Sequence, residues 1–287
     1  MLVSTKEMLQ DARRNHYAVA AINTQGGQYD IIRAIVDAAE NRKAPIILAH
    51  YESTGAYSGN EWFYENAKYL ANKVSVPVGI HLDHGSSFGI CMEALKLGFT
   101  SIMYDASEKS IERNIEESNE IIRIAHAFNV PVEVEIGALQ RLDDGVATDI
   151  DANIVSSKTV IGFLDKCRPD SLAIGIGNAH GFYHETPNLR LDILDDVSRH
   201  SDIPLVLHGC TGMDDNQVRE AIRKGISKIN YGTLIRSKYV EFLKEGIQNL
   251  DHQDHTWKIS RYASAKLTKV VEEIIELSGS EGKAYNY

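Results

Sequence analysis

The stretch VPVGIHLDH, residues 76–84, joins a strand pattern to a cluster of polar side chains. Its first half is apolar and rich in β-branched residues, which is typical of a buried strand. Its second half places His81, Asp83 and His84 within four positions. Burying a carboxylate and imidazoles costs several kcal/mol unless each group finds a partner. The stretch therefore predicts a strand that ends in a functional site.

Seven similar runs recur along the chain, at residues 17–23, 45–51, 100–107, 130–137, 171–180, 203–209 and 226–232. Amphipathic helical patterns lie between the runs, at residues 30–43, 62–74, 89–98, 111–128, 159–167, 191–200 and 215–225. Apolar strands that alternate with helices imply a parallel sheet covered by those helices, and eight such units close a (β/α)8 TIM barrel. A doubly wound open sheet is the alternative, but no GxGxxG follows the first strand. We predict an α/β fold in one TIM-barrel domain over residues 1–287.

The two ends of the chain carry further helical patterns. The amphipathic residues 1–15 are expected to cover the floor of the barrel. Residues 234–250 and 264–279 predict two extra C-terminal helices, which residues 251–257 join.

Composition limits the partners and the compartment. The formal net charge of -10 argues against nucleic acid, because phosphate binding needs clustered Lys and Arg. No segment approaches about 18 consecutive apolar residues, and the first residues lack the apolar region of a signal peptide. Cys91, Cys167 and Cys210 are widely spaced and form no CxxC pair, so the sequence predicts neither a disulfide framework nor a cysteine zinc site, which fits a reducing compartment. We expect a cytoplasmic protein without nucleic-acid or membrane partners.

Polar side chains lie near the C-terminal ends of the predicted strands. In TIM barrels these ends meet at one mouth, where the catalytic groups are found. The residues concerned, from seven of the eight predicted strands, are Asn23, Asp83, His84, Asp105, Glu135, Asn178, His180, His208 and Asn230. The sequence therefore predicts one site at the carboxyl end of the barrel.

Three histidines from three strands, His84, His180 and His208, suit a catalytic zinc site, which takes three protein ligands and leaves one position open. A lone histidine at a strand end is more often a hydrogen-bonded core or rim residue. Three histidines that each neighbour a glycine favour the metal interpretation. Asp105 is a candidate to orient a ligand histidine, while Asp83 and Glu135 could instead pair in salt bridges.

Glycines and hydroxyls follow the last three strands in HGFY (180–183), HGCTG (208–212) and NYGT (230–233). Barrels commonly bind phosphate after strands seven and eight. The glycines could instead serve tight turns, but beside a metal site they favour a phosphorylated substrate.

Five motifs together resemble the class II, zinc-dependent ketose-bisphosphate aldolases, which include the fructose- and tagatose-bisphosphate enzymes. They are HLDHG (81–85), VEVEIG (132–137), SLAIGIGNAHGFY (171–183), IPLVLHGCTGM (203–213) and ISKIN (226–230). The resemblance implies reversible aldol cleavage of a ketose 1-phosphate or bisphosphate to dihydroxyacetone phosphate and an aldehyde. It implies that His84, His180 and His208 hold Zn²⁺, which polarises the ketone, and that Asp83 is the acid/base at the C4 hydroxyl.

The resemblance also implies further ligand contacts. Asn23, Gly181, Gly209, Thr211, Asn230 and Thr233 match substrate- and phosphate-binding positions, with a monovalent cation, Na⁺ or K⁺, nearby. Asp105 and Glu135 match acidic positions around an alternative metal position. Members of the family are dimers or tetramers, so a homodimer or homotetramer is expected.

The chain departs from the family pattern on the aldehyde side. Where the family has a flexible Gly-Gly followed by the glutamate that acts on the C3 proton, this chain has GALQRLDDG (137–145). We expect Asp143, or Asp144 beside it, to replace that glutamate. With the changed ends of strands one and two, the loop indicates an atypical distal group. Arg141 or His50 is expected to meet a carboxylate, a sulfonate or a differently placed phosphate.

Other functions remain open from the sequence. A phosphosugar isomerase or epimerase could use the same zinc site, and the altered loop is compatible with a non-catalytic phosphosugar-binding homologue. A zinc hydrolase usually carries HxH on its first strand, where this chain has only Asn23. Retention of Asp83 favours an enzyme, because binding alone needs no acid/base.

Overall fold

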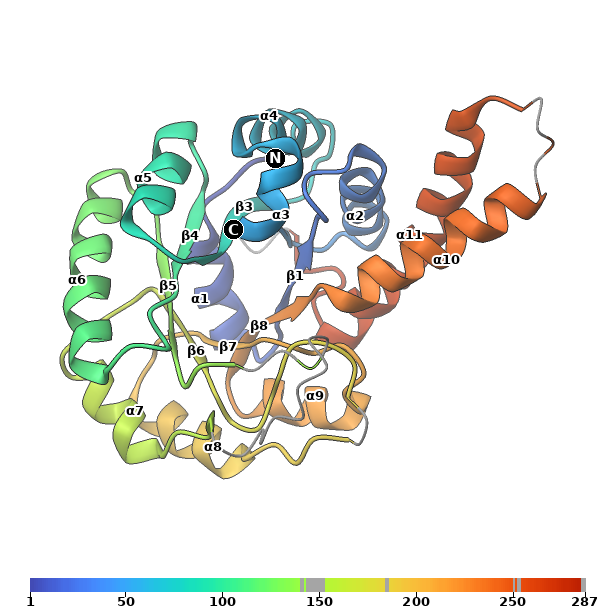
Figure 1. The fold of residues 1–287 in the computed structure, drawn as a ribbon. Coiled ribbons are helices and arrows are strands. Elements are labelled where there is room, and N and C mark those ends of the chain that lie inside the picture. Colours follow the sequence, from blue (N-terminus) through green and yellow to red (C-terminus); the bar gives the residue numbers. More distant parts are fainter. Residues whose placement is uncertain (140–141, 143–152, 184–185, 250, 252–253, 285–287) are drawn as a thin grey trace.

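The computed structural model describes residues 1–287 except 140–141, 143–152, 184–185, 250, 252–253 and 285–287. Within the described residues, eight strands close a barrel in sequence order (Figure 1). They are β1 (Val19–Asn23), β2 (Ile46–Tyr51), β3 (Val78–Gly85), β4 (Ser101–Tyr104), β5 (Val132–Ile136), β6 (Ser171–Ile174), β7 (Leu205–Leu207) and β8 (Ile226–Tyr231). All neighbouring strands are parallel, and β8 closes on β1. The predicted TIM barrel is confirmed.

Helices surround this barrel (Figure 1). They are α1 (Thr5–Asn15), α2 (Tyr29–Arg42), α3 (Glu52–Ser58), α4 (Asn60–Ala71), α5 (Phe88–Leu97), α6 (Ile111–Ala127), α7 (Ser157–Leu164), α8 (Leu191–His200), α9 (Asp215–Arg223), α10 (Thr233–Asn249) and α11 (Thr256–Ser278). Several begin at a side-chain cap, since Ser87, Ser110 and Asp214 accept hydrogen bonds from backbone N–H groups of the first turn. Helix α3 escaped prediction because its sequence, ESTGAYS, has no apolar periodicity.

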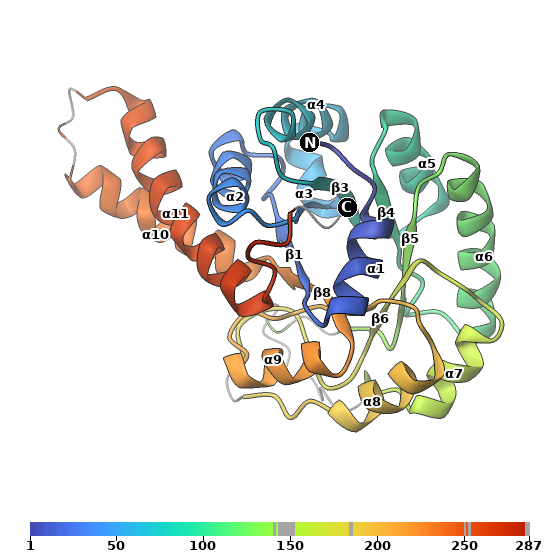
Figure 2. The ribbon, with the colours of Figure 1, turned by 180° about the vertical axis from the view of Figure 1, so that it is seen from behind.

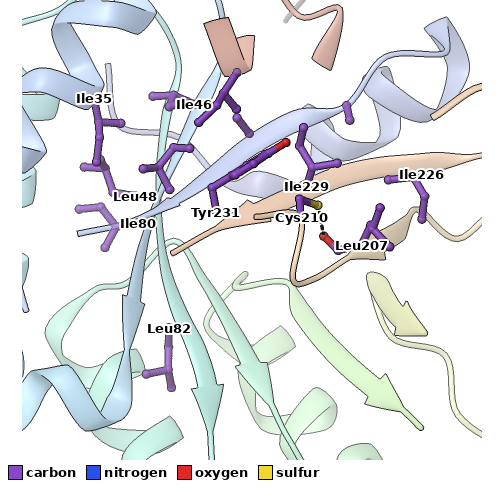
Figure 3. Packing of buried hydrophobic residues seen from close by; sticks show 14 of the residues in the cluster. Ile35, Ile46, Leu48, Ile80, Leu82, Leu207, Cys210, Ile226, Ile229 and Tyr231 are labelled. Atoms are coloured by element: carbon purple, nitrogen blue, oxygen red, sulfur yellow. Dashed lines mark hydrogen bonds between the residues drawn. The ribbon is translucent and has the colours of Figure 1, made fainter. Parts of the chain in front are cut away.

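The main hydrophobic core lies between the outer face of the strands and these helices. Figure 3 shows Ile46, Leu48 and Ile80 from neighbouring strands beside Ile35 of α2, and all four are fully buried. Burial of each such side chain contributes about 1.5–3 kcal/mol. This layer anchors the strands and so sets the position of every side chain that points into the barrel.

A second cluster closes the bottom of the barrel. Helix α1 lies across the end opposite the carboxyl ends of the strands (Figure 2). Its Met8, Leu9 and Ala12 pack against Val19 of β1 and Ile47 of β2, which point inward. The expectation that the first residues cover the barrel floor is confirmed.

Helices α10 and α11 form a hairpin that projects from the barrel (Figures 1 and 2). Helix α11 packs against α10 within the hairpin and against α2 of the barrel. The two predicted C-terminal helices are therefore present. In the part of the chain that the structure describes, no helix is long and apolar enough to cross a membrane.

Three strands end two or more residues before the end of the predicted run. Strand β6 ends at Ile174, where prediction extended the strand to residue 180. A Cβ atom at Gly175 would lie 2.5 Å from the carbonyl oxygen of Asn153, and Gly177 has φ +97°. The chain thus leaves the strand at these glycines, and His180 belongs to the following loop. Similarly, β4 ends at Tyr104 and β7 at Leu207, so Asp105 and His208 follow their strands directly.

Candidate metal centre and active site

Side chains two residues apart on a strand point to the same side, and three strands use this alternation to carry polar groups into the barrel. A lower layer comes from β3, β5 and β8, and an upper layer follows two residues later on the same strands. The lower layer is His81, Glu133 and Lys228, and the upper layer is Asp83, Glu135 and Asn230. The upper layer faces the loops at the carboxyl end.

The three predicted zinc ligands lie together above this layer. The ring centroid of His84 is 5.0 Å from that of His180 and 4.8 Å from that of His208. One nitrogen from each ring lies within 4.8 Å of the others. His84 Nε2 is buried and has no hydrogen-bond partner among the described residues. Three imidazole nitrogens thus surround a common point, and His84 Nε2 has no other partner among the described residues. This arrangement fits a zinc ion.

His84 is held in a strained conformation. Its φ of +53° lies in the left-handed region, which costs a residue with a side chain about 1–3 kcal/mol and is typical of functional sites. Its Nδ1 donates to Asp105 Oδ2 at 2.7 Å, and Ser107 Oγ donates to the other oxygen of Asp105 at 2.7 Å. Burial lowers the pKa of His84, but the hydrogen bond to Asp105 together with the charges of the surrounding carboxylates outweighs burial and raises the pKa to about 9. Asp105 thus orients the ring so that Nε2 faces the other histidines.

A second group could hold a metal on the other side of His84. Ligand atoms of His84, Asp105 and Glu135 lie within 4.8 Å of one another. Glu135 is buried, and its Oε2 has no hydrogen-bond partner in the described part of the chain. Burial, followed by the charge of Asp105, raises the pKa of Glu135 to about 8. The alternative metal position that the family resemblance implies at Asp105 and Glu135 stays a prediction.

Asp83 lies at the base of a cavity beside the histidines and is 6% exposed. Its Oδ1 accepts a hydrogen bond from Asn230 Nδ2 at 3.2 Å. Burial opposes ionisation of Asp83, but nearby positive charges, that of His84 first and that of Lys228 further away, outweigh it and lower the pKa of the carboxyl group. The group is therefore an ionised proton acceptor.

The cavity above Asp83 has a volume of about 240 Å³. One wall consists of glycines and threonines after strands β6 to β8, and a second wall comes from the end of β1 and the loop after it, from the end of β2, from α3 and from α10. The first wall is Gly181, Gly209, Thr211, Gly232 and Thr233, and the second is Asn23, Gln25, Tyr51, Ser53, Thr54 and Arg236. Arg236 is the sole lysine or arginine among the described residues of the lining. A second cavity of about 560 Å³ adjoins it on the far side of His84.

Gly209 is required by the close approach of two loops. It has φ +69°, and a Cβ atom there would lie 2.0 Å from the carbonyl oxygen of Ala179. The hydroxyl of Tyr183 joins the same loops: it accepts from Ala179 N at 2.8 Å and contacts the carbonyl oxygens of Ala179 and Gly209. Thr211 Oγ1 accepts from Leu234 N at 3.1 Å and so links this wall to the first turn of α10.

Other predicted residues lie in different surroundings. Asn23 lines the cavity, where its Oδ1 accepts from the backbone and side chain of Gln25, each at 2.9 Å. His50 lines neither cavity: its ring is fully buried and stacks on Phe63 of α4 at 4.0 Å, and its Nε2 contacts Asn60 Oδ1 at 2.9 Å. The structure therefore does not place His50 against the substrate. Arg141, Asp143 and Asp144 lie outside the described residues.

Sequence reasoning missed two features of the site. Arg236 reaches the cavity from α10, and Ser53 and Thr54 reach it from α3, two helices whose patterns carried no signal for a site. Glu133, which contacts His208, could have been found because it precedes Glu135 by two positions and so points the same way.

Known proteins similar to this chain share one family name. The family model for class II fructose-bisphosphate aldolase matches residues 3–283. The chain is 35% identical to the fructose-bisphosphate aldolase of Mycoplasma pneumoniae, over 99% of this chain and 100% of that protein. It is 34% identical to the sulfofructosephosphate aldolase of Alkalicoccus urumqiensis, over 99% of each. The crystal structure of the YdjI aldolase from Escherichia coli K12 superposes with a TM-score of 0.84 at 31% identity, over 99% of this chain and 100% of that one.

The chain therefore belongs to the class II fructose-bisphosphate aldolase family and is a carbon–carbon lyase. The recognition of this family from the five sequence motifs is confirmed. Members of the family are generally zinc-dependent, and the two groups of His, Asp and Glu side chains described above could hold a metal ion.

Proposed function

We propose that the protein catalyses metal-dependent, reversible aldol cleavage of a ketose 1-phosphate or ketose bisphosphate to dihydroxyacetone phosphate and an aldehyde. The observation that carries the proposal is the placement of an ionised Asp83 beside three converging histidines, in a cavity with a wall of glycines and hydroxyls. Membership of the aldolase family supports this reaction class.

His84, His180 and His208 would hold the zinc ion. When bound, zinc acts as a Lewis acid that polarises the substrate ketone. Asp105 keeps the ring of His84 turned toward the other two, through the hydrogen bond at Nδ1. The chain thus contributes imidazole ligands whose orientation is set before the substrate arrives.

Asp83 would move the proton of the cleavage step. As a carboxylate it accepts the proton of the C4 hydroxyl when the C3–C4 bond breaks, and in condensation it returns the proton to the aldehyde oxygen. Asn230 holds the carboxylate by the hydrogen bond at Oδ1. For the second proton transfer, at C3 of dihydroxyacetone phosphate, we propose Asp143, with Asp144 as the substitute.

The first wall of the cavity would bind the phosphate of dihydroxyacetone phosphate. Backbone N–H groups near Gly181 and Gly209 and the hydroxyls of Thr211 and Thr233 are the donors that a phosphate accepts. Helix α10 begins at Thr233, so the positive end of its dipole would also face the phosphate. We also propose a Na⁺ or K⁺ ion beside this phosphate, and a homodimer or homotetramer in the cytoplasm.

The second wall would bind the distal end of the substrate. Relatives of similar identity are named for fructose bisphosphate and for sulfofructose phosphate, so the distal anion is a variable feature among proteins like this one. Arg236 supplies a positive charge on this wall, with Gln25, Ser53 and Thr54 as polar neighbours. We propose an anionic distal group, which Arg236 and Arg141 would recognise: a phosphate, a sulfonate or a carboxylate.

The test measures release of dihydroxyacetone phosphate by the zinc-loaded protein, with and without chelator. The panel holds fructose 1,6-bisphosphate, tagatose 1,6-bisphosphate, sulfofructose 1-phosphate and fructose 1-phosphate. We expect chelator-sensitive release. It should be fastest with fructose 1,6-bisphosphate, tagatose 1,6-bisphosphate or sulfofructose 1-phosphate, because the distal end of each is anionic. Interconversion of the ketoses without release would indicate an isomerase or epimerase. Binding of dihydroxyacetone phosphate without turnover of any substrate would indicate a non-catalytic homologue.

A further inference from the structure

A buried ion pair lies directly below the metal site. Lys228 Nζ of β8 is 2.8 Å from Glu133 Oε2 of β5, and each side chain is 1% exposed. Replacing a buried ion pair by apolar residues is often neutral or even stabilising, because desolvation offsets the attraction of the charges. Stability alone therefore gives no reason for these two charges, and we considered what else they contact.

The other oxygen of Glu133 contacts a predicted metal ligand. Oε1 lies 2.8 Å from Nε2 of His208, whose ring is fully buried. A carboxylate only accepts hydrogen bonds, so Nε2 must carry the proton. On the opposite side of the ring, Asn230 Nδ2 lies 3.4 Å from His208 Nδ1 and can only donate. Both contacts select the tautomer of His208 in which Nδ1 has the free electron pair.

Lys228 is held by a second partner in the same layer. Its Nζ lies 3.4 Å from His81 Nε2, and His81 Nδ1 contacts Ser101 Oγ at 2.8 Å. Burial, followed by the charge of Lys228, lowers the pKa of His81 to about 3, so this ring is neutral and its Nε2 accepts from the ammonium group. His81, which the sequence singled out beside Asp83, thus belongs to the ion-pair layer rather than to the metal ligands.

The contrast with His84 shows why the tautomer matters. Asp105 binds Nδ1 of His84 and leaves Nε2 for the metal, whereas Glu133 binds Nε2 of His208 and leaves Nδ1. If the ring of His208 turned over, or if its proton moved to Nδ1, an N–H group would face the metal position. Carboxylates that hold a ligand histidine in this way typically contribute about 10- to 100-fold to metal affinity.

We propose that Glu133, anchored by Lys228, is a positioning residue that fixes His208 with Nδ1 toward the metal. The proposal rests on the metal site of the proposed function. It assigns a role to the lower layer of the barrel interior, below the cavity in which the substrate would bind.

The first experiment needs no substitution at the ion pair. Long-range ¹H–¹⁵N NMR of the ¹⁵N-labelled, metal-free protein reports which ring nitrogen of each histidine carries the proton, and the spectrum of His208→Gln identifies the signals of His208. We expect a neutral ring protonated at Nε2. A proton on Nδ1, or a rapidly exchanging mixture of the two tautomers, would overturn the proposal.

The second experiment compares two double variants that both remove the charges. Glu133→Gln/Lys228→Met keeps an amide oxygen that can accept from His208 Nε2, while the amide N–H can donate to His81. Glu133→Leu/Lys228→Met has no hydrogen-bond acceptor at position 133 for His208 Nε2. Zinc affinity is measured by competition with a chromogenic chelator, and folding is checked by circular dichroism. Ser171→Ala is the matched control, since Ser171 Oγ donates to Glu133 at Oε2, at 3.4 Å, which is the oxygen that faces Lys228 and not the one that faces His208.

We expect the Gln variant and Ser171→Ala to bind zinc within about threefold of wild type, and the Leu variant to bind about 10- to 100-fold more weakly. Equal affinities of the Gln and Leu variants, with tight binding by wild type, would refute the positioning role and leave the metal site intact. Failure of the wild type itself to bind zinc would overturn both the metal site and this role of Glu133.

Discussion

Removal of Lys228 alone should destabilise the protein more than removal of the whole ion pair. In Lys228→Met the carboxylate of Glu133 stays in the barrel interior, 1% exposed, and loses the ammonium group 2.8 Å away. An uncompensated buried charge of this kind costs about 3–5 kcal/mol. With an unfolding entropy of about 2.1 cal/mol/K per residue, a chain of 287 residues loses roughly 1.7 °C in Tm per kcal/mol. The expected decrease in Tm is therefore about 5–8 °C.

Differential scanning calorimetry of chelator-treated protein measures this effect without the stabilisation that bound zinc adds. Glu133→Gln/Lys228→Met is the control, and its Tm should lie close to that of wild type because no buried charge remains. In the single variant the folded-state pKa of Glu133 rises above its unfolded value, so its penalty should shrink as the pH is lowered and the carboxyl group takes up a proton. A single variant within 1 °C of wild type, or a double variant no more stable than the single one, would refute the reasoning.

Three further outcomes are expected. Asp83→Asn should lower the cleavage rate by about 10²- to 10⁴-fold at unchanged zinc content, and a full rate would exclude Asp83 as the acid/base. Arg236→Gln should raise KM about 10- to 100-fold for a substrate with an anionic distal group but leave the KM for fructose 1-phosphate unchanged. Lys238→Gln on the same helix is the control. Equal effects on the KM of both substrates would place Arg236 at the first phosphate. Burial opposes ionisation of Glu40, but hydrogen bonds from Lys43 and Ser75 lower its pKa to about 2. The difference in Tm between wild type and Glu40→Gln should therefore be complete above about pH 5 and disappear toward pH 2, and a constant difference would contradict this assignment.

The fold could be predicted because each strand carries a local signal. Runs rich in Val and Ile bounded by helical patterns identified every strand of the described barrel. The C-terminal end of β6 was predicted wrongly for a physical reason. SLAIGIG is typical of a strand, but Gly175 and Gly177 allow the chain to turn away close to the carbonyl oxygens of Asn153 and Asn188. Those contacts come from distant parts of the chain, so no local pattern reveals them.

The site was predictable to the extent that strand ends meet at one mouth. His84, His180, His208 and Asp83 lie together as expected. His50 shows how a single position decides the outcome, since Tyr51, the next residue of β2, lines the cavity while His50 points outward onto Phe63. The alternation of side chains along a strand already contained this distinction.

The sequence by itself determined which residue types stand at the carboxyl ends of the strands. Because side chains alternate along a strand, it also determined which of these residues share a face of the sheet. Only the tertiary structure decided which polar groups pair inside the barrel. Glu133 contacts His208 across 75 positions of the chain and Lys228 across 95. These contacts depend on the register in which the sheet closes, with Glu133 beside Ser171 and Lys228 beside Val206. Closure brings one carboxylate between an ammonium group and an imidazole, and this geometry selects the nitrogen that His208 presents to the site.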